Sequence, residues 1–334
     1  MRGTLIGSGR RPPWPVLAGL ALALALLPSG GAFAQGHYPE RAVRIIVPFA
    51  AGGATDITAR LLAQGLTEAF NQTVVVENRP GAGSNLGAAA VAHAEPDGYT
   101  LLLASSGIIA SPALYKKLTY DIFTDLAPIA ELVGTTNVFV VSPQSSIKTL
   151  KDVVDQAKAS PGKMNYVHPG VGTTPQLAME LFKLRAGIAI TSVAYGGAAP
   201  ASQAILSGTV ELGSMALSNI HGQVKAGAFR AIAVTGAERW EDLPDVPTVQ
   251  ESGYPNFDFE TIFILMAPAR TPPAIVRLLS EESIKILKKP DVRERVEKAG
   301  FAVLARGPEA LKARIAREVP IYKEIVAKAG IPVN

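Results

Sequence analysis

The feature that most constrains the fold is a buried strand that runs directly into a glycine-rich loop and then into a helix start, in the segment VRIIVPFAAGGATDITAR (43–60). The apolar run Val43–Val47 is typical of a covered strand, and Pro48 ends it. Gly52 and Gly53 allow the backbone to turn sharply and to approach a ligand closely. This pattern predicts an α/β fold in which the loop can hold an anion.

The helix expected after this loop has a polar start. Either Thr55 or Asp56 can cap its first turn. The first amide groups have no partner inside the helix and carry the positive end of its dipole, which stabilises an anion by about 0.3–1 kcal/mol at an exposed site. Since no Lys or Arg lies between Val47 and Ala59, we expect the backbone to bind the anion. The apolar face predicted for this helix consists of Ile57, Leu61, Leu62, Leu66, Ala69 and Phe70.

The first 34 residues have the pattern of an export signal. Arg2, Arg10 and Arg11 form a basic start, residues 16–27 are an apolar run, and Ala32-Phe33-Ala34 is a typical cleavage signal. The apolar run is too short for a membrane-spanning helix, which needs about 20 residues, and no Cys follows it that could carry a lipid anchor. We predict export with cleavage after Ala34, and Arg10-Arg11 leaves the twin-arginine route open.

Composition excludes several classes of function. The chain has a formal net charge of +4, and three of its 32 basic residues belong to the leader, so nucleic acid is not an expected partner. The 334 residues contain no Cys, which removes disulfides, thiolate metal ligands and thiol nucleophiles. Because 48% of the residues are hydrophobic, an apolar core can provide the stability instead.

Past the leader, apolar strand segments alternate with helical patterns, as in α/β folds with mostly parallel sheets flanked by helices. The length suits two domains. No linker or repeat divides the chain, so a domain boundary must be a strand crossover. Ligands in such sheets bind beyond the carboxyl ends of the strands. The predicted strands are 43–47, 74–77, 99–104, 138–141, 164–167, 191–194, 212–216 and 231–234.

A second glycine-rich loop, PGAGSNLG (80–87), follows the predicted strand 74–77. Its spacing does not match the dinucleotide-binding fingerprint, because Leu86 stands where the third glycine should be and Gly87 comes one residue late. We interpret the loop as either a second ligand-contacting helix start or a structural turn.

The second half of the chain repeats the same pattern. The segment GVGTTP (170–175) precedes a helix, and Thr173 and Gln176 have the spacing of a capping box. The segment YGGAAP (195–200) follows the predicted strand 191–194 and opens another helix. Glycines before helices are ordinary in α/β folds, but helix starts of this kind in both halves would form a clamp if they faced each other across a cleft.

The sequence shows no catalytic or metal-binding pattern. Asp56 could act as a general base, but a carboxylate at a helix start is more often a cap. Ser105 and Ser106 follow a strand without a recognisable base, although they could donate hydrogen bonds to a ligand. We predict no catalytic residue, no metal and no cofactor. The histidines form no metal-ligand pair, and apart from His37 beside the cleavage site we expect them in loops or on helix surfaces: His93, His168 and His221.

Eight segments after the leader form a specific combination: 38–63, 74–88, 96–105, 170–182, 194–201, 229–236 (FRAIAVTG), 243–255 (LPDVPTVQESGYP) and 267–276 (APARTPPAIV). Together they resemble the Bug-type periplasmic solute-binding proteins of tripartite tricarboxylate transporters. The resemblance extends over essentially all of the chain after the leader.

The resemblance implies a type II-like clamp of two α/β domains, residues 35–138 with 256–334 and residues 139–255, joined by crossover strands. It implies a periplasmic, monomeric binding protein, not an enzyme, that delivers a small carboxylate to a two-subunit membrane permease. A ligand-presenting sensor for a membrane receptor and a periplasmic enzyme are the alternatives. The expected ligand-binding residues are Phe49, Ala51, Gly53, Ala54, Thr55, Asp56, Asn85, Ser105, Ser106, Gly172, Thr173, Thr174, Tyr195, Gly196, Gly197, Ser218 and Asn219.

Three positions depart from the pattern of the family. Ile108 or Ile109 stands where many relatives carry a His, Ile262 stands where an aromatic residue is frequent, and Gln203 stands where an acidic residue is common. We infer that the walls of the binding site have changed, so the identity of the solute cannot be taken from a relative.

Overall fold

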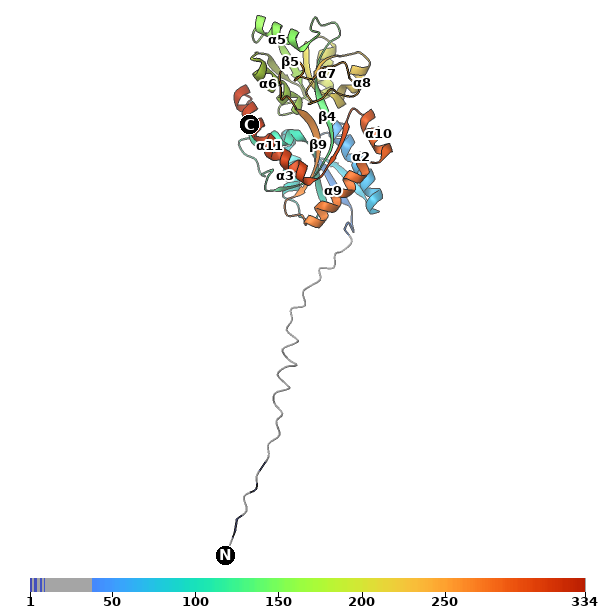
Figure 1. Cartoon of the computed structure of the whole chain (residues 1–334), viewed down its shortest axis with the longest axis vertical. Helices are drawn as coiled ribbons and strands as arrows, with labels where there is room; N and C mark the ends of the chain where they lie inside the picture. Colours follow the sequence, from blue (N-terminus) through green and yellow to red (C-terminus); the bar gives the residue numbers. More distant parts are fainter. Residues whose placement is uncertain (2, 5–6, 8, 10–37, 334) are drawn as a thin grey trace. The chain divides into compact units, whose positions relative to one another are not determined.

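The computed structural model describes residues 1, 3–4, 7, 9 and 38–333, so the apolar run and the cleavage site of the predicted leader lie outside the described residues. Residues 39–333 belong to one compact unit (Figure 1). Within the described part, no helix is both long and apolar enough to cross a membrane. The α-helices are α2 (Ala54–Phe70), α3 (Asn85–Ala92), α4 (Ser111–Leu114), α5 (Leu150–Ala159), α6 (Thr174–Ala186), α7 (Ala198–Leu206), α8 (Leu217–Lys225), α9 (Pro273–Leu287), α10 (Pro290–Lys298) and α11 (Pro308–Ala329).

The strands form a single mixed sheet in the order β2-β1-β3-β9-β4-β7-β5-β6, and β8 and β10 each pair with β4. Strands β1, β2 and β3 are parallel to one another, and so are β5, β6 and β7. The central strands β4 and β9 run antiparallel to their neighbours. The strand bounds are β1 (Val43–Val47), β2 (Val74–Asn78), β3 (Thr100–Ser105), β4 (Leu126–Val141), β5 (Asn165–His168), β6 (Thr191–Ala194), β7 (Leu212–Ala216), β8 (Arg230–Val234), β9 (Glu260–Pro268) and β10 (Ala302–Arg306).

The long strand β4 joins the two halves of this sheet. Its residues 126–136 pair with β9, and its residues 137–141 pair with β7. We call β1, β2, β3, β9 and β10 with the start of β4 the first sheet half, and β5 to β8 with the end of β4 the second sheet half. Figure 1 shows β4 and β9 running from the helices α2, α3 and α9 toward the helices α5 to α8.

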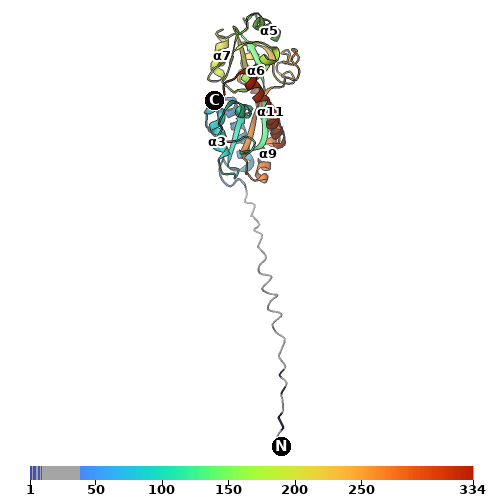
Figure 2. The same cartoon turned by 90° about the vertical axis from the view of Figure 1, so that its left-hand side faces the viewer.

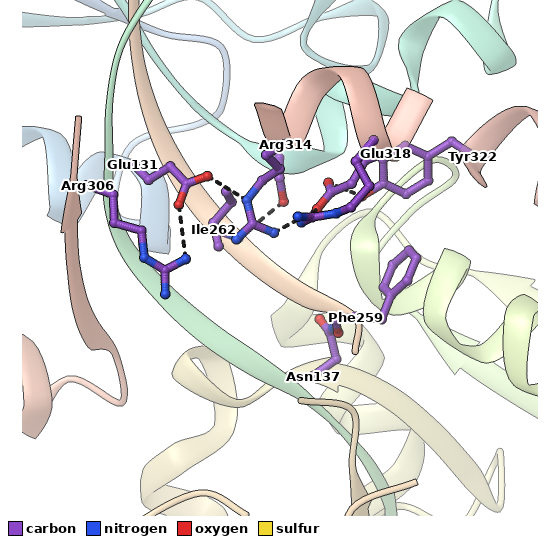
Figure 3. A network of polar contacts seen from close by, with 10 residues as sticks. Glu131, Asn137, Phe259, Ile262, Arg306, Arg314, Glu318 and Tyr322 are labelled. Carbon is purple, nitrogen blue, oxygen red and sulfur yellow. Dashed lines mark hydrogen bonds and ion pairs between the residues drawn. The ribbon is translucent and has the colours of Figure 1, made fainter. Parts of the chain in front are cut away.

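Helix α11 contacts both sheet halves, because it packs against β4, α4 and α6 (Figure 2). A buried ion-pair network holds it on β4 (Figure 3). The carboxylate of Glu131, which is 1% exposed, accepts hydrogen bonds from Nε of Arg314 at 2.6 Å and from Nη1 of Arg306 at 3.4 Å. Arg314 also donates to Glu318 at 2.7 Å. The network therefore ties β4, β10 and α11 together.

The main hydrophobic core is shared by the two sheet halves. It contains Ile46 and Leu102 from the first half, Phe139 and Phe182 from the second, and Tyr322 of α11. Burial of this continuous apolar surface is the dominant favourable term in folding. A smaller cluster around Val167 and Ile205 lies within the second half.

The strands predicted from the sequence are all present, and seven of the eight agree with the structure to within one residue. The exception is β4, which begins at Leu126 instead of Val138. Strands β9 and β10 were not predicted. Strand β9 is buried along nearly its whole length, so it lacks the alternation that identifies a strand, and β10 is short and half-exposed. The division into domains at residues 138/139 and 255/256 stays a prediction.

The predicted apolar face of α2 is wrong in part. Leu62 and Leu66 are buried as expected, but Ile57 is 48% exposed. The helix turns its small residues toward α9 instead: a Cβ atom on Gly65 would lie 2.5 Å from Cγ2 of Ile286. The buried face of α2 therefore combines Leu62 and Leu66 with the close approach of Gly65 to α9.

Candidate functional site

Loops from the two sheet halves meet around a small cavity of about 50 Å³. Among the described residues that line it, none is charged, and the polar groups are hydroxyls and backbone. The lining residues are Phe49, Gly83, Ser84, Ser105, Gly107, Ser111, Leu114 and Tyr115 from the first half and Val171, Gly172 and Thr173 from the second.

Four of these residues, Phe49, Ser105, Gly172 and Thr173, belong to the predicted ligand-binding set. They lie at the carboxyl ends of three parallel strands: Phe49 follows β1, Ser105 is the last residue of β3, and Gly172 and Thr173 follow β5. The structure therefore brings together segments that lie far apart in the sequence, as a clamp requires. The other predicted residues lie around this cavity or away from it, and their roles stay predictions.

The first glycine loop leads from β1 into α2. The first bond within the helix runs from the N–H of Ile57 to the carbonyl of Gly53 at 3.0 Å, so the amides of Ala54, Thr55 and Asp56 precede it. The predicted cap by Thr55 or Asp56 is wrong, since Gly53 occupies the N-cap position and no side chain caps it.

Asp56 is a buried anchor of this loop. Its carboxylate accepts hydrogen bonds from the N–H of Gly52, from Nε of Arg60 and from Nδ2 of Asn78, each at 2.9 Å. Burial alone would raise the pKa of Asp56, but these three donors outweigh it and hold the pKa below its usual value. A carboxylate with this environment is a poor general base. The Asp56 carboxylate also occupies the amide of Gly52. The amides of Ala54, Thr55 and Asp56 at the start of α2 are left to receive a ligand.

The second glycine loop has an unusual backbone. Gly81, Ala82, Gly83 and Ser84 all have positive φ, and α3 begins directly after them. Left-handed conformations of residues other than glycine are strained. Gly83 and Ser84 line the cavity but are not among the expected ligand-binding residues; the PGAGS motif is the signal that could have identified them.

Asn85 supports this loop from behind. Its Nδ2 donates to the carbonyl of Ala82 at 2.8 Å, and its Oδ1 accepts from the hydroxyl of Tyr120 at 2.7 Å. Gly87 allows close packing of the same segment, because a Cβ atom there would lie 2.8 Å from Cβ of Pro48. The glycine that made the motif look like a dinucleotide fingerprint therefore has a packing role.

The loop of residues 170–173 forms the cavity wall on the second sheet half. The predicted capping box between Thr173 and Gln176 is wrong. The Thr173 hydroxyl donates to the carbonyl of Gly170 at 2.7 Å, and Oε1 of Gln176 accepts from the N–H of Gly172 at 2.7 Å. These local bonds within the loop replace the cap, and they occupy the amide of Gly172.

His168 is buried at the end of β5, contrary to the expectation that it lies in a loop or on a helix surface. Its Nδ1 lies 2.9 Å from the carbonyl of Gly170, so Nδ1 carries the proton, and Nε2 lies 2.9 Å from the hydroxyl of Ser192. Burial lowers the pKa of His168 to about 4. The imidazole is therefore neutral at pH 7 and acts as a structural support of the loop 170–173.

Several predicted residues do not line the cavity. Ser106 and Thr174 are buried beneath it. Ser218 donates its N–H to the hydroxyl of Thr135 at 3.1 Å, where α8 meets the first sheet half. Of the remaining residues, Ala51, Gly53, Tyr195, Gly196 and Gly197 lie exposed or half-buried in the loops that precede α2 and α7. Ala54 and the buried Thr55 begin α2, and Asn219 is half-buried within α8.

A larger cavity, of about 410 Å³, is lined by Val171, His168, Glu180 and Lys183 together with the end of α11. Its charges neutralise each other, because Nζ of Lys183 lies 2.7 Å from the carboxylate of Glu180. Of these two cavities, the smaller one gathers glycine loops from both sheet halves. Within the described residues, no group of His, Asp and Glu is arranged to hold a metal ion.

Residues 58–331 match the model of the tripartite tricarboxylate transporter family receptor. The chain belongs to this family. The match spans most of the chain and both sheet halves apart from β1, and among the residues that line the cavity it leaves out Phe49.

Relatives of this receptor support the assignment. The chain is 34% identical over 295 residues to protein BugT of Bordetella pertussis, and the match covers 88% of this chain and 90% of BugT. Two solved structures are similar in fold. An R. palustris protein with adipate is 32% identical with a TM-score of 0.81, and the match covers 88% of this chain and 99% of that protein. MatC of Rhodopseudomonas palustris with bound malate is 32% identical with a TM-score of 0.78, and the match covers 86% of this chain and 100% of MatC. The predicted family and α/β binding-protein fold are confirmed.

Proposed function

We propose that this receptor captures a small carboxylate in the cavity between its two sheet halves and delivers it to a two-subunit membrane permease. The observation that carries the proposal is the meeting of glycine-opened helix starts from both halves around one uncharged cavity. Hydroxyls and free amides at helix starts favour an anion without a basic side chain. The adipate and malate found in two structural relatives support the same ligand class.

The size of the cavity supports a clamp. Ligand pockets typically measure about 300–1,000 Å³, several times more than the 50 Å³ between the walls. We infer that the walls separate to admit a solute and close again around it, with the two domains expected from the sequence as the moving parts. Solution scattering should give a smaller radius of gyration with solute than without it. An unchanged radius would favour a preformed pocket.

A thermal-shift comparison tests the ligand class. Adipate and malate, each beside its diamide, are added to the protein without its leader. A carboxylate present at 100 times its dissociation constant should add about 2.7 kcal/mol to the free energy of unfolding, which raises the melting temperature by several degrees. The diamides should have no such effect. Equal shifts from acid and amide would contradict the proposal.

The contribution of the first glycine loop can be tested at Ala54, the first residue of α2. Ala54→Glu places a competing carboxylate at the helix start, so affinity should fall at least about tenfold while the fold is retained. Ala69→Glu introduces the same charge on an exposed position in the last turn of the same helix and should bind normally. Calorimetry on both variants separates a local effect from a general effect of charge.

The leader pattern and the family support a cellular role. We propose that the leader is removed after Ala34 and that the receptor works as a monomer in the periplasm, without chemistry on its solute. Mass spectrometry of the exported protein should show Gln35 at the amino terminus. Pull-down with solute should recover permease subunits, and prolonged incubation should return adipate intact. Recovery of a signalling receptor instead would favour the sensor alternative.

A further inference from the structure

Two adjacent residues of β9, Thr261 and Ile262, lie beneath the cavity and bond to both of its walls. The hydroxyl of Thr261 lies 2.6 Å from the hydroxyl of Thr174, the first residue of α6. The N–H of Ile262 donates to the hydroxyl of Ser106 at 3.1 Å. One dipeptide of the first sheet half therefore contacts a wall segment from each half.

The bonded residues are next to residues that line the cavity. Ser106 follows Ser105, and Thr174 follows Thr173. Ser106 and Thr174, which bond to β9, are themselves shielded from the cavity: Ser106 is 0% and Thr174 is 2% exposed. Their hydroxyls are used to hold the walls, so the neighbouring residues are the ones that face a solute.

The hydrogen bonds of Thr261 have a defined direction. Its hydroxyl donates to Oδ1 of Asn137 at 2.8 Å, and a hydroxyl has only one proton to donate. Thr174 must therefore donate to Thr261. Asn137 in turn donates through Nδ2 to the carbonyl of Phe259 at 2.8 Å. In Figure 3, Asn137 lies beside Phe259, whereas Ile262 lies further along β9, beside Arg314.

This chain of bonds connects the cavity wall of the second half to the strands shared by both halves. Thr261 pairs with Thr135 in the ladder between β9 and β4. Every group in this series of hydrogen bonds is buried, so the loss of one partner leaves a buried polar atom unsatisfied. The Thr261 hydroxyl thus links the α6 start to β9, while Ser214 of β7 holds the same helix start from within the second half by donating to the carbonyl of Pro175 at 2.6 Å.

We propose that Thr261 is a positioning residue for solute binding, which sets the distance between the two walls of the cavity without contacting the solute. This inference rests on the proposed function in naming the ligand, but the placement of the walls can be measured without one. It assigns to Ser106 and Thr174 the role of wall supports in place of direct ligand contact.

Matched variants isolate the hydroxyl of Thr261. Thr261→Val keeps the shape and removes the hydroxyl, whereas Thr261→Ser keeps the hydroxyl. Thr248→Val makes the same change at a threonine that is 1% exposed, whose hydroxyl accepts from the N–H of Glu251 away from the cavity. By calorimetry with adipate and malate, Thr261→Val should weaken binding about fivefold or more. Thr261→Ser and Thr248→Val should stay within about twofold of the unmodified receptor.

Hydrogen exchange of the ligand-free protein provides a second readout. Thr261→Val should speed exchange of the amides in residues 171–177 about fivefold relative to the rest of the chain, and Thr261→Ser should restore slow exchange. If neither adipate nor malate binds the unmodified receptor, the proposed ligand class fails, and exchange alone decides the inference.

Two results would overturn the inference. One is unchanged exchange in Thr261→Val, or the same local increase in Thr248→Val. The other is a loss of affinity in Thr174→Val that Thr261→Val does not share, because that difference would make the Thr174 hydroxyl a direct ligand contact.

Discussion

The carbonyl oxygen of Gly172 lies only 3.3 Å from the position that a Cβ atom would take on Gly107. Gly107 belongs to the turn after β3 and Gly172 to the loop before α6, so the two sheet halves touch at this point, at the edge of the cavity. A side chain on Gly107 would meet backbone that cannot rotate away.

We therefore expect Gly107→Val to keep the walls apart and to weaken carboxylate binding by about tenfold, roughly 1.4 kcal/mol. The fold should be retained, because Gly107 does not have positive φ. Gly222→Val, at an exposed glycine of α8 with no atom within 4 Å of its Cβ position, is the control. Calorimetry should show normal affinity for the control, and normal affinity for Gly107→Val would mean that the halves do not need to approach this closely.

His168 should make stability depend on pH in a mildly acidic window. Burial lowers its pKa from 6.5 to about 4, so between these values the unfolded chain binds a proton that the folded chain does not. The free energy of unfolding should therefore fall as the pH drops from 6.5 to 4, by about 3 kcal/mol from this group. His168→Gln should flatten the decline, whereas His93→Gln, at an exposed position, should not. Urea titrations between pH 4 and 7 measure both.

Glu260 should destabilise the protein at neutral pH. Burial, and secondarily the negative charge of Asp258, raise the pKa of Glu260. Within the described part of the chain its carboxylate makes no hydrogen bond or ion pair. Glu260→Gln should therefore raise the melting temperature at pH 7, and the gain should vanish as the pH falls below the raised pKa toward 4.5. Glu238→Gln, at an exposed carboxylate of the neighbouring loop, should change nothing. A loss of stability in Glu260→Gln would indicate that the charge is compensated.

The ion-pair network on β4 should respond asymmetrically to the loss of its members. Glu131→Gln leaves Arg314, whose side chain is 12% exposed, with one carboxylate fewer, and should reduce the free energy of unfolding by about 3 kcal/mol. Arg306→Gln removes a partner that is 54% exposed and should cost less than about 1 kcal/mol. Denaturant titration of the two variants tests the difference. Similar losses of unfolding free energy in both variants would show that the burial of Arg314 does not determine how much the network stabilises the protein.

The sequence alone does not distinguish the roles of neighbouring residues. Ser105 and Ser106 look equivalent as a pair of serines after a strand, as do Thr173 and Thr174 before a helix. Only the position of β9 distinguishes them, because its Thr261 and the amide of Ile262 bind one member of each pair. Strand β9 reaches this place through antiparallel pairing with β3 and β4, which depends on residues far apart in the chain.

The sequence by itself determined the parallel strands, the glycine-opened helix starts and the family, because apolar runs, turn glycines and motif combinations are local properties. It also named Phe49, Ser105, Gly172 and Thr173, which the structure brings together around one cavity. The tertiary structure decided which amides are already occupied, as Gly52 is by Asp56 and Gly172 by Gln176. It also decided that His168 is buried and that β4 and β9 join the halves. Each of these depends on which groups meet in space, and that is set by the packing of the whole sheet.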